Sequence, residues 1–406
     1  MSRAHIITGL DIGTTAIKVL VAQKKPKEAE LQVVSIIQEP AVGIRRGVVI
    51  NPEEVSTLLG SILEQIKSET ETRIDSVYLS VGGSHLFLTP SHGLISVSRA
   101  DQKISEEDIS RVLQAAQTFS LPSNKEIFDV FPKEFIVDGQ RGVKEPLGLQ
   151  GVRLEAEVLA LGGFSPYLKN LTQAILNSDL QILDLIPSPT ASARACLTPR
   201  QKELGVALLD IGAGTSGLVV FEEGDLIHLA ILPMGSSNIT NDIAIGLKCD
   251  IDIAERIKIE YGSCFLGSNY SPRKKREKVD IGEEEPLVFS HKQLAGIIED
   301  RVSEIFREVN KELKKISREK LLPAGLVLTG GGSKLSKMVD LAKKELKLPV
   351  KLSKPKGILD IDDPGLATVC GLVLGGADLE KEERGGVTLR NGIGNKIKRF
   401  FKIFIP

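Results

Sequence analysis

The chain has 406 residues, of which 42% are hydrophobic and 26% charged, and its formal net charge is −1. This balance predicts a cytoplasmic globular protein of several domains and gives no sign of nucleic-acid binding. The first residues contain no hydrophobic region of the signal-peptide type, and no apolar run reaches the ~18–20 residues of a transmembrane helix.

Two apolar strands joined by a glycine turn open the chain. They run from His5 to Leu10 and from Ile17 to Ala22, and the turn Asp11–Thr15 reads Asp-Ile-Gly-Thr-Thr. Glycine lets backbone N–H groups close on an anion, the hydroxyls add donors, and the Asp can hold Mg²⁺ through water. A helix is predicted next, from Pro52 to Lys67.

A change of pattern marks residues 84–159 as a small inserted α+β unit. A helix is predicted from Ser105 to Thr118, where Ser-Glu-Glu-Asp opens it. Short strands are predicted from Glu126 to Phe131 and from Glu134 to Val137. The unit interrupts the first half of the chain, so we expect the segments on either side of it to share one domain.

The Leu-Asp-Ile-Gly sequence of the first turn returns about one domain length later. Strands Val206–Leu209 and Leu218–Phe221 flank the second copy, and the turn Asp210–Ser216 reads Asp-Ile-Gly-Ala-Gly-Thr-Ser. A single Asp-Ile-Gly is also typical of an ordinary hairpin turn, but duplication at domain spacing disfavours that interpretation. The repeat predicts two similar domains that face one ligand, with phosphate between the turns.

A third glycine cluster follows the short apolar strand that begins at Leu326. The segment Leu326–Lys334 reads Leu-Val-Leu-Thr-Gly-Gly-Gly-Ser-Lys, and a helical pattern runs from Lys337 to Leu346. Alone, the cluster is equally consistent with a flexible loop. Together with the two turns it predicts a unit of strand, glycine turn and helix, where a flat or charged ligand group approaches the backbone near the helix N-terminus.

The last sixteen residues, 391–406, have the pattern of an amphipathic helix. The apolar stripe consists of Ile393, Ile397, Phe400, Phe401 and Phe404, and the basic residues Lys396, Arg399 and Lys402 lie mostly opposite. No acidic residue follows Glu383. The pattern predicts a helix that binds anionic membrane lipids, while a helix docked on the protein's own core is the alternative. The charged, glycine-containing segment Ala377–Arg390 before it predicts a flexible tether.

The three glycine motifs together resemble those of the actin, sugar-kinase and heat-shock-chaperone ATPase superfamily. Its five motifs match phosphate 1 at Asp11–Lys18, connect 1 at Asp184–Cys196, phosphate 2 at Asp210–Ser216, adenosine at Thr329–Lys334 and connect 2 at Asp363–Ala377. The resemblance implies an α/β actin-like ATPase fold, in which two duplicated ribonuclease-H-like domains flank a nucleotide cleft. It also implies ATP and Mg²⁺ as ligands.

Within the superfamily, the chain resembles the bacterial cell-division FtsA family through residues 254–262, through Leu328–Lys334 and above all through its tail. The resemblance implies a self-polymerising protein, peripheral to the cytoplasmic face of the cell membrane at the division site. Such a protein tethers the tubulin-like FtsZ by the C-terminal peptide of FtsZ and recruits later division proteins. The inserted unit would be the extra FtsA subdomain, which serves polymer and partner contacts.

The predicted organisation has four subdomains and a tail. The first actin-like subdomain takes 1–83 and 160–200, the inserted subdomain 84–159, the second actin-like subdomain 201–243 and 322–378, the nucleotide-capping and partner-binding subdomain 244–321, a flexible linker 379–390 and a membrane-targeting helix 391–406.

The superfamily resemblance also implies which residues meet the nucleotide. Asp11 and Asp210 would hold Mg²⁺ through water, without a confident catalytic residue. Glu255 and Lys258, on one helical face, would hold the ribose hydroxyls, and Lys334 would lie over the adenine. The implied nucleotide-binding set is Gly13, Thr14, Thr15, Lys18, Gly212, Ala213, Gly214, Thr215, Ser216, Glu255, Lys258, Gly330, Gly331, Gly332, Ser333 and Lys334.

Two of these assignments have plain alternatives. Lys18, seven positions after Asp11, would reach phosphate oxygens or would be a strand lysine that faces solvent. Glu255 and Lys258 would otherwise form an ordinary exposed ion pair on a helix.

Connect 1 departs from the chaperone ATPases, because Ser188 stands where they carry a glutamate. Without that carboxylate, the water that attacks the γ-phosphate lacks its usual orienting group, and a general-base contribution of roughly 10²–10⁴-fold is lost. We therefore expect slow ATP hydrolysis or none. Asp184 lies nearby in sequence and is the alternative orienting group; a turnover above about 1 per second would contradict the expectation.

Two other classes of protein share parts of this pattern. PilM, the ATP-binding pilus-assembly relative, has a similar fold without the amphipathic tail. A small-molecule kinase shares the two phosphate turns but needs a catalytic Asp in the first domain, and no sugar-kinase-type motif supplies one here. The tail is the feature that discriminates among these classes.

Overall fold

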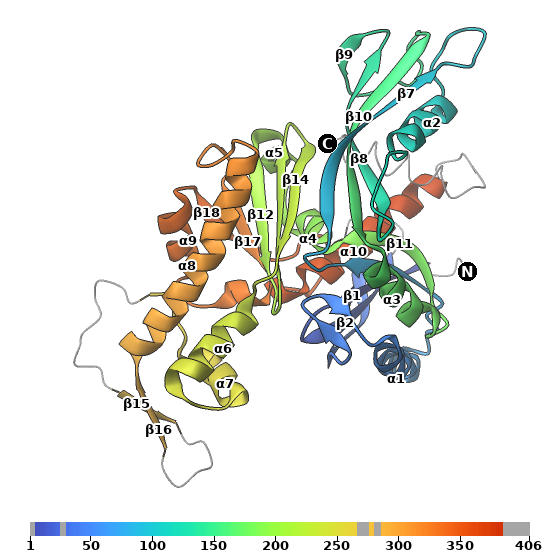
Figure 1. Ribbon diagram of the computed structural model, residues 1–406. Helices are drawn as coiled ribbons and strands as arrows, with labels where there is room; N and C mark the ends of the chain where they lie inside the picture. Colours follow the sequence, from blue (N-terminus) through green and yellow to red (C-terminus); the bar gives the residue numbers. More distant parts are fainter. Residues whose placement is uncertain (1–4, 25–29, 266–275, 280–285, 385–406) are drawn as a thin grey trace.

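Two five-stranded sheets of the same design form the two halves of the molecule, and a smaller sheet is inserted into the first half (Figure 1). The computed structural model describes residues 5–24, 30–265, 276–279 and 286–384. None of the helices in this part of the chain has the length and apolar character that crossing a membrane requires.

The first sheet contains the hairpin that the sequence predicts around the first glycine turn. Its strands, in spatial order, are β11 (Gln181–Pro187), β6 (Ser76–Val81), β1 (His5–Ile12), β2 (Ala16–Lys24) and β3 (Gln32–Pro40). Strand β1 pairs antiparallel with β2 and parallel with β6, and β6 pairs parallel with β11. Helices α1 (Pro52–Thr70) and α3 (Ser165–Leu176) pack against each other and against this sheet. The Asn51 side chain caps α1 by accepting from the first N–H groups of the helix.

The second sheet repeats the first. Its strands, in spatial order, are β14 (Asp225–Leu232), β13 (Ser216–Glu222), β12 (Val206–Ile211), β17 (Leu326–Thr329) and β18 (Val350–Leu352). Strand β12 pairs antiparallel with β13 and parallel with β17, as β1 does with β2 and β6. The two halves share strand order and strand direction, which confirms the duplicated fold predicted from the repeated turn.

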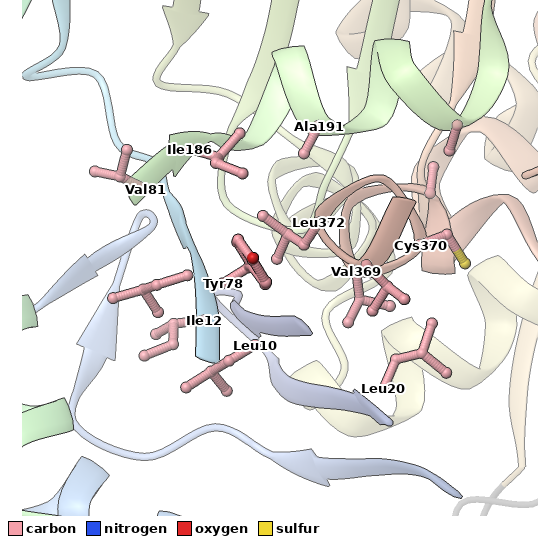
Figure 2. Packing of buried hydrophobic residues seen from close by; sticks show 14 of the residues in the cluster. Leu10, Ile12, Leu20, Tyr78, Val81, Ile186, Ala191, Val369, Cys370 and Leu372 are labelled. Carbon is pink, nitrogen blue, oxygen red and sulfur yellow. The ribbon is translucent and has the colours of Figure 1, made fainter. Parts of the chain in front are cut away.

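Two helices cross between the sheets and exchange sides. Helix α4 (Ser188–Cys196) follows β11 of the first sheet but packs on β12, β13 and β17 of the second. Helix α10 (Ala367–Arg384) follows the second sheet but packs on β1, β2 and β6 of the first. They approach so closely that a Cβ atom on Gly371 would lie 1.7 Å from the carbonyl oxygen of Ala191. Figure 2 shows Ala191 in the same apolar layer as Val369 and Leu372 of α10.

Helix α10 is longer than the sequence pattern suggests. A flexible linker was expected to begin at residue 379, but the helix continues to Arg384. Ala377 is buried, and Asp378 pairs with Arg194 of α4 at 2.8 Å. Leu, Glu, Lys and Arg, which follow Asp378, are good helix formers, so a helix that is anchored by burial extends through them.

The inserted unit is a four-stranded sheet covered by one helix. Its strands, in spatial order, are β7 (Phe87–Ser96), β10 (Arg153–Phe164), β8 (Lys125–Val137) and β9 (Gln140–Val143), with α2 (Glu106–Ala116) on one face. Ser105 and Asp108 form the capping box that the sequence predicts. Two separate strands were expected within β8; instead one strand passes through Pro132, because a bulge at this point of the β8–β10 ladder accommodates the extra residue.

The remaining elements surround the second half, apart from a small strand pair within residues 44–49, which packs against α3 in the first half. They are α5 (Pro199–Leu204), α6 (Ser236–Leu247), α7 (Ile251–Tyr261), α8 (His291–Lys315), α9 (Met338–Leu346), the hairpin of β15 (Arg276–Val279) with β16 (Leu287–Ser290), the small pair β4 (Ile44–Arg45) and β5 (Val48–Val49), and the short 3-10 helices η1 (Gly331–Lys334) and η2 (Pro364–Leu366). Helix α6 holds the second glycine turn, because its first N–H groups, from Ser236 and Ser237, donate to Gly212 O at 2.9 Å and Ala213 O at 2.8 Å.

Candidate nucleotide-binding cleft

A cavity of about 880 Å³ lies between the two halves. Its lining comes from both glycine turns, from α6, α7 and η1, and from Asp363 and Gly365. Ligand cavities in proteins commonly enclose about 300–1,000 Å³. The fold therefore brings motifs that are far apart in the sequence to one cavity of small-molecule size.

The two glycine turns have the same backbone and face each other. Gly13 N donates to Ala16 O at 3.1 Å, and Gly212 N donates to Thr215 O at 3.0 Å. Thr14 of the first turn lies against Gly214 of the second, where an added Cβ would come within 2.6 Å of the Thr14 hydroxyl oxygen. That hydroxyl also accepts from Gly47 N at 2.9 Å, which leaves its proton free for an anion.

Asp11 ends β1 with two unlike partners. Its Oδ1 accepts from the Ser80 hydroxyl at 2.8 Å, and its Oδ2 lies 3.5 Å from Lys18 Nζ. Lys18 Nζ also donates to Gly365 O at 2.8 Å. The Lys18 side chain lines the cavity, so the alternative of a solvent-facing strand lysine is wrong. Among the described residues, Lys18 Nζ has one hydrogen bond to a neutral carbonyl and one long contact with a carboxylate, so it can still bind a further anion.

Asp210 occupies the matching position at the end of β12, with two hydroxyl partners instead. Its Oδ2 accepts from Ser192 Oγ at 2.5 Å and from Thr368 Oγ1 at 3.1 Å. Burial raises the pKa of Asp210, and the opposing effects of the Ser192 hydrogen bond and the Lys18 charge do not cancel it. Gly330 closes over Oδ1, since a Cβ there would lie 2.2 Å from it.

Helices α6 and α7 form the wall on the side of the second half. Lys258 Nζ donates to Glu255 Oε2 at 2.6 Å and to Thr240 Oγ1 at 2.8 Å, and the Thr240 hydroxyl donates to Glu255 Oε2 at 2.5 Å. Lys258 is only 7% exposed, so the alternative of an ordinary surface ion pair is wrong. This buried cation and hydroxyl fix the Glu255 carboxylate at the edge of the cavity.

The glycine loop after β17 folds differently from the prediction. The helix predicted from Lys337 to Leu346 is confirmed as α9, but the glycine residues form η1, so they do not lie at the N-terminus of α9. A tight turn of Gly330, with φ of 85°, separates the strand from η1. Gly331 has open space where a side chain would be, and Lys334 Nζ donates to Asp363 Oδ2 at 2.9 Å.

Most of the predicted nucleotide-binding residues line the cavity. These are Asp11, Gly13, Thr14, Thr15, Lys18, Asp210, Gly212, Ala213, Thr215, Glu255, Lys258, Gly330, Gly331, Gly332 and Lys334. Gly214, Ser216 and Ser333 are not among the described residues that line it. The Ser216 hydroxyl donates to Met234 O at 2.7 Å, and that of Ser333 donates to Gly330 O at 2.6 Å, so both stabilise their turns instead of facing the cavity.

Sequence reasoning missed several polar residues that support the site. Ser80, Thr240, Asp363 and Thr368 line the cavity, and Ser192 lies directly behind Asp210. Ser80 and Thr240 lie between the motifs, Ser192 lies in connect 1, and Asp363 and Thr368 lie in connect 2, but none of them carries a spacing signal of its own. The pairing of β1 with β6 would have pointed to Ser80, because that residue ends up beside Asp11 in the parallel ladder.

Connect 1 contributes Ser188 to the cavity, at the first turn of α4. Its hydroxyl donates to Val81 O at 3.3 Å. Asp184, the alternative orienting group for water, lies within β11, where its Oδ1 accepts from Leu185 N at 2.9 Å. Asp184 is not among the described residues that line the cavity. The alternative that Asp184 orients the attacking water in place of the missing glutamate is therefore wrong.

The duplicated sheets, the crossed helices and the shared cavity define the actin-like ATPase fold, as predicted. Solved structures of this kind are similar in shape to the chain. The type IV pilus biogenesis complex PilM-PilN aligns with a TM-score of 0.64 and 18% identity, over 91% of this chain and 97% of that one. MreB5 of Spiroplasma citri bound to ADP aligns with a TM-score of 0.57 and 14% identity, over 94% of this chain and 99% of that one.

The chain belongs to the FtsA family of cell-division proteins, which confirms the resemblance found in the sequence. The family profile described as cell division protein FtsA matches residues 207–371, and that of the SHS2 domain inserted in FtsA matches residues 83–161. The FtsA of Pseudomonas aeruginosa is 35% identical over 94% of this chain and 91% of its own length. The FtsA of Bacillus subtilis is 32% identical over 92% and 84%, respectively.

Proposed function

We propose that the chain is an ATP-binding, actin-like cell-division protein that assembles with itself and anchors FtsZ to the cytoplasmic face of the cell membrane at the division site. The observation that carries the nucleotide part is the cleft between the duplicated halves. There, two matching glycine turns and the loop at Gly331 face one cavity of nucleotide size.

In this proposal the phosphates lie between the two turns and the nucleoside lies against α7 and η1. Thr14, Thr15 and Thr215 supply hydroxyl donors, and Lys18 supplies a positive charge. On the other side, the fixed Glu255 carboxylate accepts from ribose hydroxyls, and the open face of Gly331 admits the flat base. MreB5 of Spiroplasma citri, which has a similar fold, is bound to ADP in one structure and to AMPPNP in another.

Magnesium fits the two carboxylates at the equivalent ends of β1 and β12. Mg²⁺ prefers oxygen ligands, keeps several waters and commonly binds through one or two carboxylates together with substrate phosphates. Asp11 and Asp210 both line the cavity, so they would hold the ion through water. Bound there, Mg²⁺ would neutralise phosphate charge.

Nucleotide acts as a conformational switch in this proposal, and hydrolysis is slow. A ligand that contacts both halves binds the closed cleft better than the open one, and thereby favours the shape that polymerises. The hydroxyl of Ser188 is too weak a base to replace a carboxylate at the attacking water. Asp252, Glu255 and Glu260 also line the cavity, but they lie on α7, the nucleoside side of the cleft.

The membrane part of the proposal rests on the sequence of the tail. The predicted helix and its residues from Ile393 to Phe404 lie outside the described residues. Basic residues contribute about 1 kcal/mol each near an anionic leaflet, and buried apolar side chains roughly 1.5–3 kcal/mol each, against the entropy of ordering a short helix. One tail should therefore bind weakly, while the linked tails of a polymer bind strongly. Family membership supports FtsZ and later division proteins as partners.

Sedimentation with anionic liposomes, with and without ATP, tests the proposal. The full chain is compared with a chain that ends at Arg384, because an end at Ala377 would remove the Arg194–Asp378 ion pair and shorten a buried helix. We expect only the full chain to pellet, more so with ATP, and to carry FtsZ with it. Equal pelleting of both chains would contradict membrane targeting by the tail, and would favour a pilus-type adaptor or a kinase.

A further inference from the structure

Asp363, which precedes η2, connects two of the lysines that line the cleft, Lys18 and Lys334, through one turn. Its Oδ2 accepts from Lys334 Nζ at 2.9 Å, and its Oδ1 accepts from Gly365 N at 2.8 Å. Gly365 O in turn accepts from Lys18 Nζ at 2.8 Å. The Asp363 carboxylate thus binds Lys334, on the adenosine side, directly. Through the turn it also orients the Gly365 carbonyl, which accepts from Lys18 on the phosphate side.

The turn itself is fixed to the glycine loop. Pro364 O accepts from Gly330 N at 3.1 Å and from the Thr329 hydroxyl at 3.2 Å. All the atoms that link Lys334 to Lys18 therefore belong to one hydrogen-bonded unit, which spans the cavity from η1 to β2. A change at Asp363 should reach both ends of it.

The charge state of Asp363 suits this task. Burial acts to raise the pKa of Asp363, but the hydrogen bonds from Lys334 and Gly365 N–H, together with the Lys18 charge, hold that pKa below its usual range. The carboxylate is therefore ionised at neutral pH. Lys18 donates to a neutral carbonyl at 2.8 Å and lies 3.5 Å from the Asp11 carboxylate, so its shortest contact does not involve an opposite charge and it can still bind an incoming phosphate.

We propose that Asp363 is a positioning residue of the cleft, which sets Lys334 for the nucleoside and, through Gly365, sets Lys18 for the terminal phosphate. The inference rests on the proposed nucleotide function and deepens it. Lys18 should contribute more to a triphosphate than to a diphosphate, because the additional phosphate brings the additional negative charge. Asp363 therefore governs the preference for ATP over ADP.

Two variants of Asp363 separate its two contacts. In Asp363→Asn the remaining carbonyl oxygen still accepts from Gly365 N, whereas the amide nitrogen cannot accept from Lys334. This variant should weaken ATP and ADP binding alike, as Lys334→Met should. Asp363→Ala loses both contacts, so the ratio of ATP affinity to ADP affinity should fall by about tenfold, the loss of one charge-assisted hydrogen bond. Equilibrium titrations of the full chain with each nucleotide measure both effects.

Asp362→Ala is the matched control. The Asp362 side chain is 87% exposed, pairs with Lys354 at 3.0 Å and does not line the cavity, so both affinities should stay unchanged. An unaltered ATP-to-ADP ratio in folded Asp363→Ala would overturn the inference. If that variant does not fold, unequal effects of Asp363→Asn and Lys334→Met on the two nucleotides would overturn it. If the unaltered chain binds no nucleotide, the proposed function is overturned as well. If the unaltered chain binds nucleotide and the Asp363 variants have the same affinities, only this inference is overturned.

Discussion

The two glycine turns share one backbone and differ in nearly every side-chain partner. The Gly13–Ala16 and Gly212–Thr215 hydrogen bonds close the same loop at the ends of β1 and β12. Yet Asp11 meets a serine and a lysine, while Asp210 meets the hydroxyls of Ser192 and Thr368. Duplication therefore preserved the frame on which an anion can bind and let the chemistry of the two sides diverge.

The divergence follows from the close approach of the turns. The first turn carries Thr14 where the second, aligned by its hydrogen bond, carries Ala213, and Gly214 leaves room for the Thr14 side chain. Two identical turns with side chains on both sides would collide at this contact. The first turn therefore supplies the side chain at this contact, and Gly214 of the second turn supplies the space for it.

Substitution at Gly330 should break the second half most severely. In Gly330→Ala the new Cβ would lie 2.2 Å from Asp210 Oδ1 and 2.6 Å from Ile211 O, at a φ of 85° that side chains avoid. We expect the free energy of unfolding to fall by about 3 kcal/mol. Chemical denaturation measures it. Gly331→Ala is the control, because a Cβ on Gly331 would have no atom within 4 Å, and it should lower the free energy of unfolding far less. Equal losses in the two variants would show that the packing of Gly330 on Asp210 is not what matters.

A threonine in place of Gly214 on the second turn should lower the free energy of unfolding less than Gly330→Ala does. Gly214→Thr places a Cβ 2.6 Å from the Thr14 hydroxyl, which forces the turns apart. The free energy of unfolding should fall by about 2 kcal/mol. The double variant Thr14→Gly/Gly214→Thr should recover about 1 kcal/mol of this loss, because it returns one side chain to the contact. Additive losses in the double-mutant cycle would contradict direct contact between the turns.

The smallest expected effect is on the pH dependence of stability, which should differ between Asp210 and Asp11. Because burial raises the pKa of Asp210 in the folded chain, its ionised form opposes folding, and stability is lost as pH rises from the usual carboxyl range through the raised pKa. Asp210→Asn removes this dependence while it can still accept from Ser192. The variant should therefore be more stable than the unaltered chain at neutral pH and lose that advantage in acid.

Asp11→Asn is the counterpart, since it removes a carboxylate that lies near Lys18. This variant should gain no stability at neutral pH. Thermal unfolding of the three chains across pH measures the difference. A gain of the same size from Asp11→Asn would mean that the two sites are electrostatically alike.

The sequence predicts the parts of the cleft that repeat or that follow local rules. The two hairpins follow from apolar alternation around Asp-Ile-Gly, and α1 follows from the capping residue Asn51. The i, i+3 spacing of Glu255 and Lys258 places them on one helical face, where the structure joins them. In each case the cause lies within a few residues of the effect.

The rest depends on contacts between distant segments. Nothing near Ser192 or Thr368 in the chain shows that α4 and α10 exchange sheets and bring both hydroxyls to Asp210. The extension of α10 beyond Ala377 likewise depends on burial and on the partner Arg194, which a local pattern of charge and glycine does not show. The two short strands predicted within β8 are one strand for the same reason, because the bulge that accommodates Pro132 involves the neighbouring strand β10.

The cavity between the two halves is the proposed nucleotide site. A crystal structure of the full chain with Mg²⁺ and a non-hydrolysable ATP analogue tests it most directly. We expect phosphates between the turns at Gly13 and Gly212, Mg²⁺ joined through water to Asp11 and Asp210, and the base against Gly331. An analogue bound outside this cavity, or an empty cavity at saturating analogue, would show that the cavity is not the nucleotide site.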